Sequence, residues 1–363
     1  MSEKNTVSRV DDRDRRDFFK TAGKSIAVAS AMMAVKSSRA GAAAPPDGAG
    51  RIASNTYAVR HLFKRVSRFR PPTEHQKQLK EKYGEITMLD FPQFTKDTYP
   101  GVNKMDLWSS LFGDSEDEGQ FGTREFRGRT RRGDFEPSRP TSRKWLDKLA
   151  SKIASTGVTA QHISNNAPRN ISDLDAEKRR EGIRIGKIWL DAAKQIGAKS
   201  MPVNTGGPRI APSASAESGY PTNDEIVPYI KNAIESFKQL ADYGEKVGVK
   251  TTIENHWGLS ANPMNVRIIL NEVNSPFLEA SPDFCNWEHE YMLYHGLEAL
   301  IPYASSMVHG KRWVRYPHVD IARCVEVLKK ANYQGTIALE YETNNDDPVE
   351  GTRKLMTDIV AAL

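Results

Sequence analysis

Four short runs of apolar and β-branched residues in the second half of the chain each end in a potential metal ligand. The runs lead to Glu254, Asp283, His309 and Glu340, which are 29, 26 and 31 residues apart. These intervals match one strand, one crossover helix and two loops of a βαβ unit. Parallel strands connected in this way have their C-terminal ends on one side, so we expect the four side chains to converge. The spacing predicts an α/β fold with a site at one end of a parallel sheet.

The converging side chains form a mixed set of oxygen and nitrogen ligands. Carboxylates together with an imidazole suit a divalent cation such as Mn²⁺, Co²⁺, Mg²⁺ or Zn²⁺. A single Asp, Glu or His is more often structural than a ligand, so the hypothesis depends on the recurrence of the pattern. We predict one divalent ion held by Glu254, Asp283, His309 and Glu340.

The alternation of strands and helices can be followed from residue 141 onwards. Helical patterns cover residues 141–155, 175–196, 223–247, 263–273, 296–304 and 319–331. Strands are expected at 157–164 and 198–204, in the run that ends at Glu254, and at 277–283, 307–311 and 336–342. Nearer the N-terminus, 52–59 is a candidate first strand, while 85–91 and 102–108 compete for the second. Eight strands in all predict a closed (β/α)8 TIM barrel with its active site at the C-terminal strand ends.

The motifs around the ligands resemble a known family. The order Glu, Asp, His, Glu, the phrases IENHWG, PDFCNW, VHGK and LEYE, and the pair Val319-Asp320 resemble the sugar phosphate isomerase/epimerase family of xylose isomerase-like barrels. The resemblance covers about residues 155–345. It implies that the four ligands bind one divalent metal and that Glu254 and Glu340 also act as acid and base catalysts, as in epimerase members.

A metal flanked by two glutamates suits proton transfer next to a carbonyl. The cation polarises the carbonyl and stabilises an enediolate, while a carboxylate on each face of the sugar removes and returns a carbon-bound proton. We therefore predict a metal-dependent sugar isomerase or epimerase. Candidate substrate-binding residues are His256, Trp257, Asn286, Lys311 and His162.

His256, Trp257 and Lys311 also suit a structural role that supports the site without touching the substrate. His162 also suits a hydrogen-bonded strand residue without a substrate contact. Asn286 stands three residues after Asp283, where several epimerases and related endonucleases of the resembling family have a histidine. An amide can bond a sugar hydroxyl, but it is a poorer metal ligand than an imidazole.

Other functions remain open on the same barrel. A metal-dependent lyase of 3-keto-glycosides uses the same removal of a carbon-bound proton, followed by elimination. An abasic-site endonuclease needs several metal ions and a larger histidine set, and the DxxH and DxH pairs of that class are missing here. A non-catalytic sugar-binding protein is the remaining alternative. We expect a sugar as the partner, without nucleic acid or stable membrane insertion, and homo-oligomerisation stays open.

The first 44 residues are interpreted as a twin-arginine signal peptide. Arg15-Arg16-Asp17-Phe18-Phe19-Lys20 precedes a weakly apolar stretch and the small residues Ala40-Gly41-Ala42. This order predicts export to the periplasm or medium, with residues 45–363 as a single barrel domain. The leader carries nine Lys or Arg against five Asp or Glu, out of a formal charge of +6 for the whole chain. The remaining domain is nearly neutral, which argues against nucleic-acid binding.

An arginine-rich segment interrupts the barrel pattern at about residues 113–140. Residues 124–144 hold seven Arg and one Lys against three acidic residues. We interpret the segment as a solvated loop inserted between strands, with an anion-binding patch as the alternative. The two cysteines, Cys285 and Cys324, are expected to be unpaired thiols.

Overall fold

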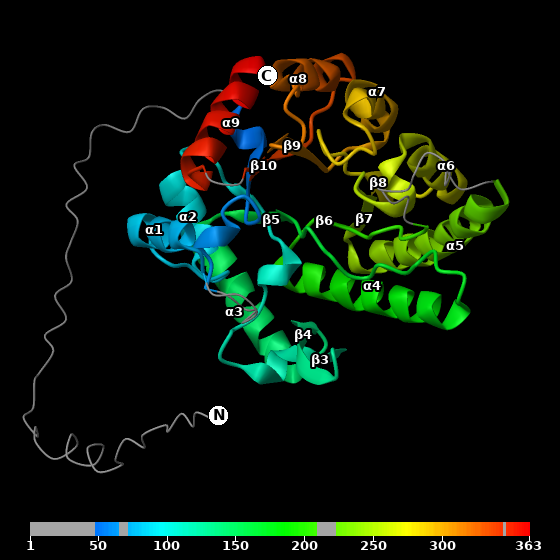
Figure 1. Cartoon of the computed structure of the whole chain (residues 1–363), viewed down its shortest axis with the longest axis horizontal. Helices are drawn as coiled ribbons and strands as arrows, with labels where there is room; N and C mark the ends of the chain where they lie inside the picture. The colour runs from blue at the N-terminus through cyan, green and yellow to red at the C-terminus, as the bar shows by residue number, and fades with distance from the viewer. Residues whose placement is uncertain (1–47, 65–71, 209–222, 344–345) are drawn as a thin grey trace, which may run out of the picture. The chain divides into compact units, whose positions relative to one another are not determined.

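Eight short parallel strands form the centre of the fold in a computed structural model that describes residues 48–64, 72–208, 223–343 and 346–363 (Figure 1). The strands are β1 (Ile52–Asn55), β2 (Lys104–Asp106), β5 (Thr159–His162), β6 (Ser200–Pro202), β7 (Lys250–Ile253), β8 (Leu278–Ala280), β9 (Met307–Trp313) and β10 (Thr336–Glu342). Their order in the sheet is β8-β7-β6-β5-β2-β1-β10-β9, so each strand follows its predecessor around the barrel. The predicted leader, residues 1–44, lies outside the described residues.

The two edge strands of this sheet meet at two of the predicted metal ligands. Asp283 and His309 form a parallel bridge, in which the amide of His309 donates to the Pro282 carbonyl at 2.9 Å. The amide of Phe284 in turn donates to the His309 carbonyl at 3.0 Å. The sheet therefore curls into a barrel whose seam runs through the candidate site.

Helices connect the strands and pack side by side around the barrel (Figure 1). They are α1 (Glu74–Tyr83), α2 (Phe91–Thr98), α3 (Pro140–Thr156), α4 (Ala176–Ile196), α5 (Asn223–Val247), α6 (Pro263–Val273), α7 (Leu293–Leu300), α8 (Ile321–Lys330) and α9 (Pro348–Ala362). Each helix from α2 to α9 contacts its neighbours in sequence. In the described part of the chain, every helix is too short or too polar to cross a lipid bilayer.

Local signals explain where these helices start and stop, as α4 illustrates. The side chain of Asp175 accepts a hydrogen bond from the amide of Glu177 at 2.8 Å, which satisfies one of the free donors of the first turn. Gly197 ends the helix in the left-handed conformation, with φ of 78°. Between these caps, Ile183 and Leu190 face the core, so the amphipathic pattern and the caps give the same helix.

Apolar side chains fill the barrel below the strand ends. Ala53, Met307 and Ala338, from the adjacent strands β1, β9 and β10, form a small cluster of fully buried residues. The much larger core lies between the sheet and the helices, where Phe237 and Leu240 of α5 are fully buried. The barrel is therefore a packed scaffold, and its active site is expected at the C-terminal ends of the strands.

The structure decides between the two candidates for the second strand. Residues 102–108 contain β2, which pairs with both β1 and β5. The competing segment contributes only an isolated bridge between Ile86 and Phe63, and α2 begins at Phe91. The other predicted helices and strands are found within a few residues of their expected bounds.

The arginine-rich segment is not the solvated loop that its composition predicted. It lies between β2 and α3, as expected, but it forms an antiparallel hairpin of β3 (Phe121–Phe126) and β4 (Arg129–Phe135). Phe121 and Phe135 are buried, and the ring of Phe135 packs against Trp145 of α3 with centroids 5.4 Å apart. These aromatic residues anchor the base of the hairpin. The composition predicted a solvated loop because the arginines dominate the segment. Cys285 and Cys324 are buried free thiols, as predicted.

Candidate active site

Three of the four predicted metal ligands come together at the C-terminal ends of β7, β8 and β9. Glu254 follows β7, Asp283 follows β8, and His309 lies within β9. The closest ligand atoms of these side chains all lie within 4.8 Å of one another. Asp283 and His309 are completely buried, and Glu254 is half-buried. The convergence expected from the spacing is therefore observed for these three residues.

Glu340 lies next to this group, but it is held by a lysine. Lys311 of β9 is the direct neighbour of Glu340 in the β9–β10 ladder, and its Nζ donates to Glu340 Oε1 at 2.7 Å. The same ammonium is 2.9 Å from Glu342 Oε2 and 4.0 Å from Asp283 Oδ2. Lys311 is only 3 % exposed, so a buried positive charge lies among three carboxylates.

Asn286 connects the candidate ligands to this lysine. Its Nδ2 donates to Asp283 Oδ2 at 2.8 Å and to Glu254 Oε1 at 3.2 Å, while its Oδ1 accepts from Lys311 Nζ at 3.2 Å. The residue has a φ of 61°, a left-handed conformation that Asn tolerates better than most residues. Asn286 therefore orients two carboxylates, in addition to the substrate contact predicted for it.

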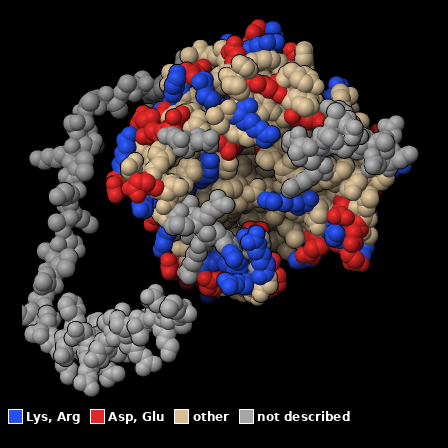
Figure 2. All heavy atoms as spheres, viewed as in Figure 1, with Lys and Arg blue, Asp and Glu red and all other residues tan. Residues whose placement is uncertain are grey.

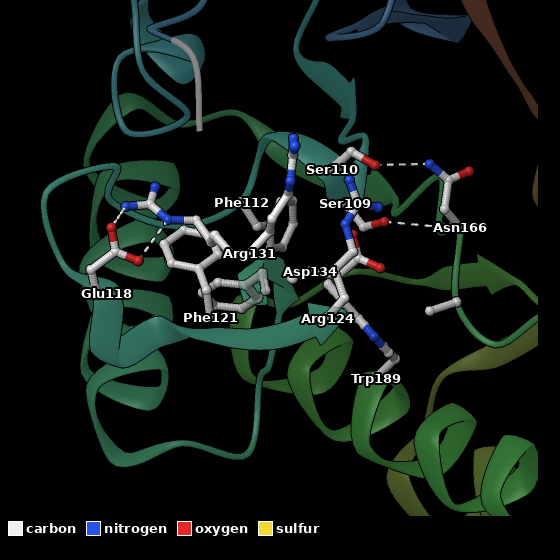
Figure 3. A pocket seen from close by; sticks show the side chains of 14 residues that line it. Ser109, Ser110, Phe112, Glu118, Phe121, Arg124, Arg131, Asp134, Asn166 and Trp189 are labelled. Atoms are coloured by element: carbon white, nitrogen blue, oxygen red, sulfur yellow. Dashed lines mark hydrogen bonds and ion pairs between the residues drawn. The ribbon is translucent and has the colours of Figure 1, made fainter. Parts of the chain in front are cut away.

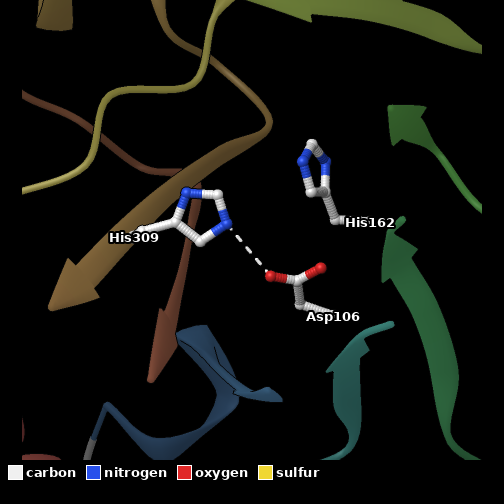
Figure 4. A group of neighbouring side chains, drawn as sticks. All are labelled: Asp106, His162 and His309. Atoms are coloured by element: carbon white, nitrogen blue, oxygen red, sulfur yellow. Dashed lines mark hydrogen bonds and ion pairs between the residues drawn. The ribbon is translucent and has the colours of Figure 1, made fainter. Parts of the chain in front are cut away.

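A second group of polar side chains surrounds the other side of His309. Asp106 of β2, His162 of β5 and His309 point toward one another from three strands (Figure 4). His309 Nε2 donates to Asp106 Oδ2 at 3.0 Å, and the two imidazole rings lie edge to face with centroids 5.6 Å apart. Asp106 also accepts hydrogen bonds from Asn55 at 2.8 Å and from the Ser164 hydroxyl at 2.9 Å. This carboxylate fixes the orientation of the His309 ring.

The second ring nitrogen of His309 is free to bind a cation. Among the described residues, the buried Nδ1 atom of His309 has no hydrogen-bond partner. A histidine that binds a metal usually donates its other ring N–H to a carboxylate or carbonyl, which is the role of Asp106 here. Together with the carboxylates of Glu254 and Asp283, this arrangement fits a divalent cation.

Burial and neighbouring charges give the two histidines opposite protonation behaviour. Burial disfavours the charged form of His309, but Glu254 and the bond to Asp106 raise the pKa of its imidazole to about 10. Burial lowers the pKa of His162 to about 4, so this ring is neutral at neutral pH. Burial raises the pKa of Asp283 well above its ordinary value, Lys311 opposes that rise, and Glu340 adds to it. Metal binding at this cluster would therefore displace a proton from His309.

The remaining predicted substrate-binding residues differ in their exposure. His256 is exposed and Trp257 is half-buried, in the loop that follows β7. Both can meet a substrate that enters from the mouth of the barrel. His162 is completely buried, and its Nδ1 is hydrogen-bonded to the Ser200 hydroxyl at 2.8 Å. Its position is that of a strand residue next to the candidate metal ligand His309.

Sequence reasoning missed Asp106 and Glu342 as members of this site. Asp106 lies inside the segment 102–108 that competed for second place, and only the observed bounds of β2 show that it ends a strand. Glu342 follows Glu340 by two residues, and side chains with this spacing lie on the same face of a strand. Glu342 also accepts a hydrogen bond from the Tyr57 hydroxyl at 2.7 Å. The site therefore contains two carboxylates, those of Asp106 and Glu342, in addition to the four predicted ligands.

Comparisons with known proteins agree with this architecture. A family model described as xylose isomerase-like TIM barrel matches residues 121–358. No curated protein matches the chain. The solved structure of apo 3-keto-D-glucoside 4-epimerase, YcjR, from E. coli has a TM-score of 0.56 and 15% identity, over 85% of this chain and 98% of that chain.

Two further solved structures share the fold with similar TM-scores. L-ribulose 3-epimerase has a TM-score of 0.56 and 12% identity, over 86% of this chain and 95% of that chain. The probable 3-DHS dehydratase AsbF from Bacillus anthracis has a TM-score of 0.54 and 11% identity, over 85% of this chain and 98% of that chain. These identities show the fold alone. The family model spans the barrel from β3 to α9, which confirms the predicted fold class, and the chain belongs to the xylose isomerase-like TIM barrel family.

Proposed function

We propose that this protein is a divalent-metal-dependent sugar isomerase or epimerase that moves a proton next to a carbonyl group. The observation that carries the proposal is the convergence of Glu254, Asp283 and His309 within 4.8 Å at the C-terminal strand ends. Glu340 lies on the adjoining strand and is linked to Asp283 through Lys311. Together these residues could hold one metal ion and place a carboxylate on either side of a bound sugar.

The chain's own residues supply the acid and base for this reaction. A bound divalent cation would supply positive charge that polarises the carbonyl of the sugar. Glu254 is half-buried and its Oε1 is oriented by Asn286 at 3.2 Å, so its other oxygen can take a proton from carbon. Glu340 is oriented by Lys311 at 2.7 Å and would return a proton from the other side. Glu340 is only 8 % exposed, which limits the access of water to its carboxylate.

The solved structures that share the fold support this class of reaction. Two of them are named as epimerases of a keto-glucoside and of a ketose, and a third is named as D-allulose 3-epimerase from Methylomonas sp., with a TM-score of 0.54 and 13% identity. Their low identity leaves the sugar undetermined. A 3-keto-glycoside lyase begins with the same proton removal, so an experiment has to separate that step from elimination.

Solvent deuterium exchange tests the proposal directly. Metal-loaded protein is incubated in D₂O with free ketoses, aldoses and 3-keto-glycosides, and incorporation at carbon is followed by NMR. We expect exchange with at least one of these sugars, and a fall of about 10²- to 10⁴-fold in Glu254→Gln and in Glu340→Gln, because Gln cannot accept the proton. Glu272→Gln, on the exposed surface of α6, is the matched control and should exchange like the wild type.

The products distinguish the two reactions. An epimer or isomer that carries deuterium supports the proposal, whereas release of an aglycone shows a lyase. Wild-type exchange in both Gln variants would show that the proton is carried by another group, and the assignment of Glu254 and Glu340 would then be wrong.

We also propose that the protein is exported through the twin-arginine route to the periplasm or the medium. The support is the sequence Arg15-Arg16-Asp17-Phe18-Phe19-Lys20 followed by small residues. Arg15→Lys/Arg16→Lys should leave the protein in the cytoplasm, as measured by cell fractionation. Unchanged export of this variant would contradict the proposal.

A further inference from the structure

A cavity of about 580 Å³ lies between the β3–β4 hairpin and the loops that follow β2 and β5 (Figure 3). Its size is within the range of small-molecule sites, which measure roughly 300 to 1,000 Å³. None of the residues predicted for the metal site or for substrate contact lines it. The hairpin therefore creates a second binding space beside the barrel.

Hydrogen bonds connect residues that line the cavity to the candidate metal site. Ser109 follows Asp106 by three residues, and its amide donates to the Ser164 carbonyl at 2.9 Å. Ser164 itself bonds Asp106 beside His309. The amide of Asn166, two residues further on, donates to the Ser109 hydroxyl at 3.2 Å. Because both loops leave the carboxyl ends of their strands, this part of the cavity lining lies at the same end of the barrel as the candidate metal ligands.

The walls of the cavity combine aromatic and polar groups. Phe112, Phe135 and Trp189 form an apolar base, with the ring centroids of Phe112 and Trp189 5.7 Å apart. Ser110 and Asn166 form a polar edge, where Asn166 Nδ2 donates to the Ser110 hydroxyl at 2.8 Å. Apolar surface with a few convergent polar groups is typical of small-molecule sites.

One of the three arginines in the lining has a structural role. Arg132 donates to both carboxylate oxygens of Glu118 and to the Ser115 carbonyl at 2.9 Å. Its guanidinium also lies over the ring of Phe121, 4.7 Å from the centroid. These contacts hold the hairpin to the segment before it, so the charge of Arg132 is offset by Glu118.

The other two arginines lie opposite each other in the hairpin. Arg124 of β3 and Arg131 of β4 are register partners, and both line the cavity. Like charges directly opposite each other on an antiparallel pair destabilise it. The lining also includes the carboxylate of exposed Asp134. Figure 2 shows Lys and Arg gathered over this hairpin, on the same face as a hollow in the middle of the molecule.

We propose that the cavity binds a negatively charged group of the substrate between Arg124 and Arg131, while the sugar ring reaches the metal site. The substrate would then be an acidic sugar or glycoside that carries a carboxylate or a phosphate ester. Guanidinium groups match both anions with paired hydrogen bonds. This inference specifies the substrate class and rests on the proposed function.

Equilibrium binding to the metal-loaded full chain tests the inference. Isothermal titration calorimetry at fixed ionic strength compares methyl glucuronide with methyl glucoside, and glucose 6-phosphate with glucose. We expect at least one anionic member to bind roughly tenfold or more tightly than its neutral partner, because charge-assisted hydrogen bonds are the stronger kind. The two pairs distinguish a carboxylate from a phosphate. In the wild type, inorganic phosphate should compete with the preferred anion.

Two double variants, each with the same loss of positive charge, test whether the anion preference arises inside the cavity. Arg124→Gln/Arg131→Gln should remove the preference for the anion and leave the affinity for the neutral sugar unchanged. Arg127→Gln/Arg129→Gln removes the same charge from the tip of the hairpin, outside the cavity lining, and should keep the preference. An equal loss in both double variants would show a general field effect and overturn the inference.

The wild-type measurement decides the question even if the first double variant does not fold. Equal affinity for charged and neutral sugars, or no binding of any anionic probe, overturns the inference. These results are separate from the test of the proposed function. A wild type that exchanges deuterium but has no anion preference refutes only the anion site. A wild type that prefers the anion but does not exchange deuterium refutes only the proton-transfer reaction.

Discussion

Lys311→Met is the substitution that tests the electrostatics of the site most sharply. The ammonium of Lys311 is buried and contacts Glu340 at 2.7 Å and Glu342 at 2.9 Å, with Asp283 at 4.0 Å. Methionine has a similar length without the charge, so the change removes the ion pairs with little loss of packing. The three carboxylates then face one another without this compensating cation.

The expected loss of stability follows from the burial of the ion pair between Lys311 and Glu340. Removing one partner of a buried ion pair typically costs about 3–5 kcal/mol, because the other charge stays buried without compensation. A change of 1 kcal/mol shifts the Tm of a large domain by about 2 °C. We therefore expect the Tm of the metal-free protein to fall by about 6–10 °C. A bound divalent cation would compensate the same carboxylates, so the loss should be smaller in the presence of metal.

The assay is thermal unfolding of wild type and variant, each with chelator and with saturating metal. The rise of Tm on adding metal should be larger for Lys311→Met than for the wild type, because ligand binding stabilises the folded state by an amount that grows with affinity. Lys250→Met is the matched control, since Lys250 pairs with buried Glu279 at 2.9 Å and begins β7, at the end of the strand opposite Glu254. An equal metal response in Lys311→Met and in the wild type would refute the reasoning.

Three further perturbations give distinct outcomes. Asp106→Asn should weaken metal affinity by about 10- to 100-fold in a metal titration, because the partner that orients His309 is altered, while exposed Asp242→Asn should not. Phe237→Ala, at a fully buried position of α5, should lower the free energy of unfolding by about 3–5 kcal/mol in chemical denaturation, and a loss below about 1 kcal/mol would contradict the packing. Metal addition should slow hydrogen exchange of the Phe284 and His309 amides, and unchanged rates would show that metal does not hold the seam between β8 and β9.

The order of strands and helices in the second half of the chain could be predicted from the sequence for two reasons. Hydrophobic patterns mark the strands and helices, and potential metal ligands recur at the strand ends. The strand over residues 336–342 and the helix over 263–273 were predicted with the bounds that the structure has. Their signals are local, since a continuous apolar run or a capped amphipathic pattern specifies its own element. The predicted convergence of Glu254, Asp283 and His309 needed only the rule that parallel strand ends meet.

The parts that the sequence did not predict depend on contacts between distant segments. The pairing of Lys311 with Glu340 depends on the register of β9 against β10, which no local pattern reveals. Asp106 contacts His309 across 203 positions of sequence, and its own strand has only three residues. Such a short strand gives too few residues for a period, so β2 could not be separated from the competing segment.

The position of the ligands links metal binding to the integrity of the barrel. Asp283 and His309 form the parallel bridge that joins β8 to β9, and the same two side chains belong to the candidate metal cluster. Their surroundings are unfavourable without a cation, because buried carboxylates repel each other and His309 has to remain charged to compensate them. A metal ion at this point would replace that compensation and connect three strands directly. Two of the residues proposed to hold the metal would then also close the fold, so loss of metal should loosen the seam at the place where the substrate reacts.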